Sequence, residues 1–106
     1  MGTFEKKLLQ TGLLLLAGCG LKYDEGQIER GRLNCKYQDL CGNLGAMGYE
    51  DVNACISDAE AQTYDEAQCP GYSSKVMDEC LDAYQKAIDA NDCAATFEEV
   101  CVVCTG

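Results

Sequence analysis

Apolar residues recur through the middle and end of this chain with the spacing of amphipathic helices. In four segments they fall at positions i, i+3, i+4 and i+7, which places them on one face of a helix. No segment alternates with a period of two for long enough to indicate a sheet. The pattern therefore predicts an all-α fold, a small bundle of about four short helices.

The first two predicted helices lie close together in the chain. The first begins after Asn34, a residue suited to capping a helix, and it ends at Gly45 and Gly48. Its apolar face consists of Tyr37, Leu40, Cys41 and Leu44. Glu50 and Asp51 lie in the first turn of the second predicted helix, where the helix dipole favours negative charge. Its apolar face consists of Val52, Cys55, Ile56 and Ala59.

The third predicted helix is the longest. Ser73 or Ser74 caps it, and it ends near Asn91. Its apolar face consists of Met77, Cys80, Leu81, Tyr84, Ala87 and Ile88. The fourth predicted helix opens with a capping-box pattern, Thr96 with Glu99. Its apolar face consists of Phe97, Val100, Cys101 and Cys104.

The chain holds nine cysteines in 106 residues, close to the density that indicates a disulfide scaffold. Eight are predicted to form four disulfides: Cys35, Cys41, Cys55, Cys69, Cys80, Cys93, Cys101 and Cys104. Eight cysteines allow roughly a hundred pairing patterns, so spacing alone leaves the connectivity open. We predict one pair, Cys55 with Cys80, because both lie at similar distances from a turn near Gln68. Each bridge contributes about 2–4 kcal/mol, which a domain this small needs.

The start of the chain has the three parts of an export signal. A basic start at Lys6–Lys7 precedes an apolar run over Leu8–Leu16, and the small residues Ala17–Gly18 follow. The apolar run is shorter than the roughly 20 residues that cross a bilayer. We therefore predict a signal peptide over residues 1–18.

The segment Leu16-Ala17-Gly18-Cys19 resembles the lipobox of bacterial lipoproteins. The resemblance covers the first 20 residues and implies that the Cys19 thiol carries a diacylglyceryl group, with cleavage just before it. It also favours the outer membrane, because Gly20 replaces the Asp that tends to retain such proteins at the inner one. N-myristoylation is disfavoured because its motif needs Ser or Thr where Lys6 stands. The open alternative makes Cys19 a further bridge cysteine behind a plain signal peptide.

Between the lipid and the helical domain the chain shows little periodicity. Residues 19–33 are charged and rich in glycine, and we predict that they form a flexible tether. The cysteine-rich helical domain is predicted to span residues 34–106.

The composition restricts the chemistry. Eighteen acidic and eight basic residues give a net charge of −10, and histidine is absent. Loss of Glu5, Lys6 and Lys7 with the signal peptide changes the charge to −11. This charge disfavours nucleic acid and anionic lipid as partners. The lack of histidine removes the commonest general base and metal ligand, and we expect no metal and no cofactor. A calcium loop opening at Asp89 fails because Ala94 and Val100 occupy its Gly and Glu positions.

Two features suggest activity. The pair Cys101–Cys104 has the C-x-x-C spacing of redox proteins, but it falls at the end of a predicted helix, where the dipole disfavours a thiolate. Structural bridges are the favoured interpretation of that pair, over redox chemistry and over zinc. Tyr23, Tyr64 and Tyr72 fall in predicted tether or loop and are candidates for an exposed contact patch.

The chain is also similar in style to small cysteine-rich predicted lipoproteins of myxobacteria and their relatives. The likeness rests on the segments "LAGC", "YQDLC", "DECLDAY" and "CVVC", and it implies no catalytic residues. We therefore expect a non-enzymatic, lipid-anchored envelope lipoprotein that presents a rigid acidic domain to a protein partner. The alternatives are a membrane-tethered thiol–disulfide enzyme using Cys101 and Cys104, and an inhibitor-like module using the loop 63–74.

Overall fold

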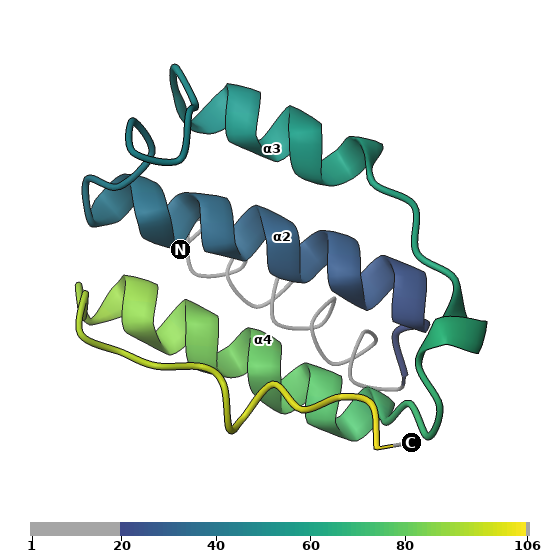
Figure 1. Cartoon of the computed structure of the whole chain (residues 1–106). Helices are drawn as coiled ribbons and strands as arrows, with labels where there is room; N and C mark the ends of the chain where they lie inside the picture. The colour runs from purple at the N-terminus through teal and green to yellow at the C-terminus, as the bar shows by residue number, and fades with distance from the viewer. Residues whose placement is uncertain (1–19, 106) are drawn as a thin grey trace, which may run out of the picture.

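A computed structural model describes residues 20–105 of the chain (Figure 1). Within that range it contains the α-helices α2 (Tyr23–Leu40), α3 (Val52–Ala61) and α4 (Ser74–Asp89), and the short 3-10 helix η1 (Glu66–Gln68). These residues form no β-strand. The predicted all-α class is thus confirmed, with three α-helices in the described range instead of about four.

The central element of the fold is α2. It packs against α3 on one side and α4 on the other, and the two outer helices lie apart from each other (Figure 1). The chain direction makes α3 antiparallel to α2, whereas α4 runs parallel to α2 after the connection through η1 (Figure 1). The helices therefore form a single layer three helices wide.

The predictions of α3 and α4 are confirmed, and so is the predicted Ser73 cap of α4, whereas Asp51, expected in the first turn of α3, is its N-cap. The Asp51 carboxylate accepts a hydrogen bond from the Ala54 backbone N–H at 2.8 Å, and the Ser73 hydroxyl accepts one from Val76 at 3.1 Å. The buried face of α4 consists of Met77, Cys80, Tyr84 and Ala87. The helix ends next to Asn91, whose φ of 56° is left-handed.

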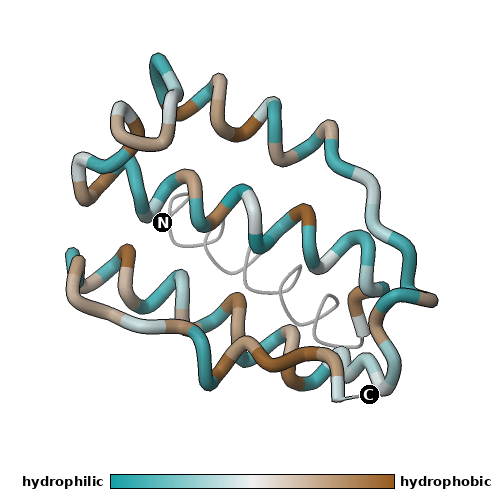
Figure 2. Tube along the Cα trace, in the orientation of Figure 1, coloured by the Kyte–Doolittle hydropathy of each residue, from teal (hydrophilic) through white to brown (hydrophobic). Residues whose placement is uncertain are grey.

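The predicted tether is wrong, because most of residues 20–33 belong to α2. Since α2 is packed on two opposite sides, its buried residues occupy two faces and leave no single apolar face to detect. Leu33 and Tyr37 pack against the α4 cluster, whereas Cys35 belongs to the cluster shared with α3. Figure 2 shows only isolated apolar positions along this helix. The folded domain thus begins by Tyr23, not at residue 34.

Two glycines that suggested a tether instead permit close helix packing. A Cβ atom built on Gly26 would lie 2.7 Å from Cγ of Met77 in α4. A Cβ atom on Gly31 would lie 2.9 Å from Cβ of Ala59 in α3. Each distance is too short for a real side chain, so the absence of Cβ sets how closely α2 approaches each neighbour.

We expect Gly31→Ala to destabilise the protein, although alanine favours helices by about 1 kcal/mol. The clash with Ala59 involves a short, rigid side chain, and such overpacking costs about 1–3 kcal/mol. Urea unfolding under non-reducing conditions measures the change. The control is Gly45→Ala, where a new Cβ meets nothing within 4 Å. A Gly31→Ala variant more stable than wild type would mean that this segment is not packed as described.

The predicted fourth helix is also wrong. Residues 91–105 form a C-terminal strap that runs back along α4 (Figure 1). It contains two turns, in which the Ala95 N–H donates to the Asp92 carbonyl and the Cys101 N–H donates to the Phe97 carbonyl. The extended end pairs with the chain before α4, where the Ser73 N–H donates to Val103 and Thr105 donates to Pro70. These bonds compete with a helix that is short and rich in β-branched residues.

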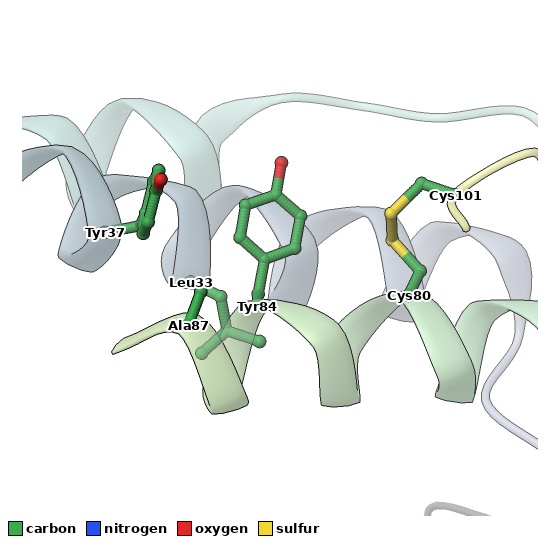
Figure 3. Close-up of a cluster of buried hydrophobic side chains, with 6 residues drawn as sticks. All are labelled: Leu33, Tyr37, Cys80, Tyr84, Ala87 and Cys101. Carbon is green, nitrogen blue, oxygen red and sulfur yellow. A yellow bond between two sulfur atoms is a disulfide. The ribbon is translucent and has the colours of Figure 1, made fainter. Parts of the chain in front are cut away.

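The strap completes the core between α2 and α4. Figure 3 shows the central cluster, which consists of Leu33, Tyr37, Cys80, Tyr84, Ala87 and Cys101. Phe97 of the strap stacks on Tyr84 with ring centroids 3.8 Å apart and meets Tyr37 edge to face. The Tyr37 hydroxyl donates to the Asp92 carbonyl at 2.9 Å. The strap therefore belongs to the folded core.

Candidate functional site

All eight predicted bridge cysteines form disulfides. The pairs are Cys35–Cys55, Cys41–Cys93, Cys69–Cys104 and Cys80–Cys101. The first joins α2 to α3, and the other three attach the strap to the rest of the domain. Every helix and the strap are thus covalently linked.

The predicted Cys55–Cys80 bridge is wrong. It assumed that α3 and α4 fold back on each other about the turn near Gln68, but α2 lies between them (Figure 1). Cys55 therefore meets Cys35 on α2, and Cys80 meets Cys101 on the strap.

The C-x-x-C cysteines do not bond to each other. Cys101 is bonded to Cys80 and Cys104 to Cys69. The Cys80–Cys101 bridge lies inside the core, with Cys80 0% and Cys101 6% exposed (Figure 3). All eight cysteines between 35 and 104 are consumed in this way, so none of them is a thiolate that could bind zinc or attack a disulfide.

The three loop and tether tyrosines come together, but not as the predicted exposed patch. Tyr23 is 8% exposed and packs edge to face against Tyr64 and Tyr72, with centroids 6.1 and 5.5 Å away. We call these three residues the tyrosine cluster. It covers Met77 and Cys69 at the end of the molecule where α2 and α4 begin. The patch prediction failed because Tyr23 lies on a packed helix.

Tyr72 attaches the start of the described chain to the segment before α4. Its hydroxyl donates a hydrogen bond to the Leu21 carbonyl at 2.7 Å. Burial and then the negative charges of nearby carboxylates raise the pKa of Tyr72 above its ordinary value of 10.0. Those carboxylates belong to Asp78, Glu66, Glu25 and Asp24. The hydroxyl thus keeps its proton at neutral pH and remains a donor.

A shallow polar depression of about 280 Å³ lies over one face of α2. It is lined by Gln27, Arg30, Gly31, Asn34, Tyr64 and Tyr84. The Gln27 side chain donates to the Tyr23 hydroxyl at 3.3 Å, and its Oε1 atom is buried without a partner. Gln27, Arg30 and Asn34 are spaced i, i+3 and i+7, so polar residues with helical spacing were present in the segment that we predicted to be a tether.

The surface charge is strongly uneven. Residues 37–74 contain seven acidic residues and neither lysine nor arginine. Arg32 of α2 bonds Glu29 and Glu60 at 2.8 Å each, and these hydrogen bonds raise the arginine pKa. The side of the molecule formed by α3 and its flanking loops is therefore negative.

The proposed signal peptide and Cys19 lie outside residues 20–105. In the described part of the chain, no helix is long and apolar enough to cross a membrane. No cluster of three or more potential metal ligands occurs in that part either.

No family model, curated protein or solved structure was found to match the chain. Its role is therefore inferred from its own residues.

Proposed function

We propose that this protein is a non-enzymatic lipoprotein of the bacterial cell envelope, anchored by lipid on Cys19. Its mature part presents a rigid, acidic, disulfide-linked helical domain to a protein partner. Gly20 after the lipidated cysteine favours the outer membrane.

The observation that carries the proposal is the pairing of the cysteines. Eight of the nine cysteines pair with one another, which leaves Cys19 as the one outside these bridges. Cys19 stands at the modified position of the lipobox-like segment, behind a basic start and an apolar run. Disulfides persist in oxidising compartments, so four bridges agree with export.

The redox alternative has less support. It requires Cys101 and Cys104 to form a disulfide with each other during exchange. In the structure each is bonded to a different cysteine, and one of these bridges is buried in the core. Breaking that bridge for catalysis would open the domain.

The negative surface indicates the chemistry of the partner. The acidic residues of segment 37–74 that lie outside η1 and its cap are Asp39, Glu50, Asp51, Asp58 and Glu60. A basic protein surface would complement them, and its association would weaken as salt is added. The domain is held rigid by its bridges, so little conformational entropy is lost on binding.

Labelling with an alkyne fatty acid in a bacterial host tests the anchor. We expect the wild type to take up label and sediment with membranes, and Cys19→Ser to lose the label completely because a hydroxyl cannot form the thioether. The matched control Cys41→Ser/Cys93→Ser removes two other cysteines and retains the label. Label on the Cys19→Ser variant would refute the proposed anchor.

A further inference from the structure

We propose that the lipidated protein has no tether and stands on its membrane by one defined end of the folded domain. The proposal rests on the lipid anchor at Cys19. We call this part the membrane-proximal end and define it as residues 20–23, η1 and residues 70–74. In Figure 1 the start of α2, η1 and the start of α4 lie together at this end.

The chain is fixed to the domain directly after the anchor. The Leu21 carbonyl is bonded to the Tyr72 hydroxyl at 2.7 Å, and α2 begins at Tyr23. A Cβ atom on Gly20 would lie 3.6 Å from the Ser74 hydroxyl oxygen. Successive Cα atoms are about 3.8 Å apart, so Leu21 lies within about 8 Å of Cys19. A lipid on Cys19 thus keeps this end at the membrane surface.

The exposed side chains of this end are those of acidic residues. The tyrosine cluster itself is packed into the domain: Tyr23 is 8% exposed, and the Tyr72 hydroxyl is bonded to the Leu21 carbonyl. Asp24, Glu25, Asp65 and Glu66 are exposed around it. Charged residues are costly inside hydrocarbon, so they keep this end among the headgroups. Their charge also repels anionic lipid, and the surface that fits is therefore zwitterionic.

The same geometry determines what faces away from the membrane. The 18 residues of α2 extend about 27 Å, and the loop 41–51 lies at the far end of that helix (Figure 1). This loop carries Met47, which is 44% exposed. An upright domain holds Met47 far above the lipid.

Energy transfer from tryptophan to dansyl-phosphatidylethanolamine in phosphatidylcholine vesicles measures this orientation. The chain contains no tryptophan, so single probes have no background. The probes are Ala67→Trp in η1 and Met47→Trp, both exposed positions, placed in the purified lipidated protein. We expect transfer to be several-fold stronger from position 67 than from position 47.

Two further variants separate orientation from anchoring. A flexible Gly/Ser linker of about twelve residues between Gly20 and Leu21 is expected to remove most of the difference between the probes. Tyr72→Phe loses the bond to Leu21 and should reduce the difference. Tyr49→Phe loses a hydroxyl bond to Asp58 on α3 and should leave it unchanged.

The two proposals fail in different ways. Equal transfer from positions 67 and 47 in protein whose mass shows acylation would overturn the upright orientation and leave the anchor intact. Absence of an acyl group from Cys19 would overturn both proposals.

Discussion

Replacing Met77 with alanine is expected to lower the free energy of unfolding by about 2–5 kcal/mol. Met77 is 0% exposed and lies at the centre of a cluster with Tyr23, Cys69 and Val103. The truncation removes apolar burial and leaves a cavity that the disulfide-linked backbone cannot collapse to fill. Urea unfolding of wild type and variant under non-reducing conditions gives the difference.

Met47→Ala is the matched control, because the same side chain is 44% exposed there. We expect it to change the free energy of unfolding by less than about 0.5 kcal/mol. Similar losses at both positions would contradict the placement of α4 against α2.

The double variant Cys80→Ala/Cys101→Ala is expected to show an equally large loss. Removing a native disulfide from a small exported domain costs about 2–5 kcal/mol and often prevents folding at 37 °C. Here the lost sulfur atoms also leave a void in the core, because both residues are buried. Circular dichroism against temperature, with the remaining bridges kept oxidised, measures the loss.

The control Cys41→Ala/Cys93→Ala separates two contributions of a disulfide to stability, the entropy of the closed loop and the packing of its sulfur atoms. Its bridge spans 52 residues and the buried one 21, so loop entropy makes the control costlier by about 0.8 kcal/mol. The void adds about 2 kcal/mol to the buried variant and much less to the control, where Cys93 is exposed and Cys41 is only half-buried. The loss of packing should therefore outweigh the difference in loop entropy, and Cys80→Ala/Cys101→Ala should have the lower melting temperature. The reverse order would show that the core does not depend on this bridge.

The helices that the sequence predicted correctly are those with one buried face. In α4 the buried residues Met77, Cys80 and Tyr84 form a single apolar face, and Ser73 caps the helix in the predicted way. In α3 the Asp51 cap fixes the start. One-sided burial produces the periodicity that a sequence pattern detects.

The two misjudged segments fail for different physical reasons. In α2, burial on two opposite sides spreads apolar residues over two faces, and Gly31 packs closely where a glycine in sequence indicates flexibility. In the strap, Phe97 and Cys101 do have helical spacing, but their positions are set by stacking on Tyr84 and by a bridge to Cys80. Contacts distant in sequence decide both segments.

In the candidate site, too, the sequence predicted some features correctly and missed those that depend on distant contacts. The number and parity of cysteines predicted correctly that eight would pair, because oxidised cysteines in a small domain rarely remain single. Their connectivity followed from the order of helices in space, which spacing does not encode. The bond from Tyr72 to Leu21, on which the proposed orientation depends, joins residues 51 positions apart and had no local signal.

The intact mass of the protein extracted from its native membrane tests the central claim most directly. We expect a chain that begins at Cys19, carries two or three acyl chains, and lacks the eight hydrogens lost in forming four disulfides. A mass that includes residues 1–18 without acyl chains would contradict the lipid anchor. A mass that includes free thiols would contradict the disulfide-linked domain.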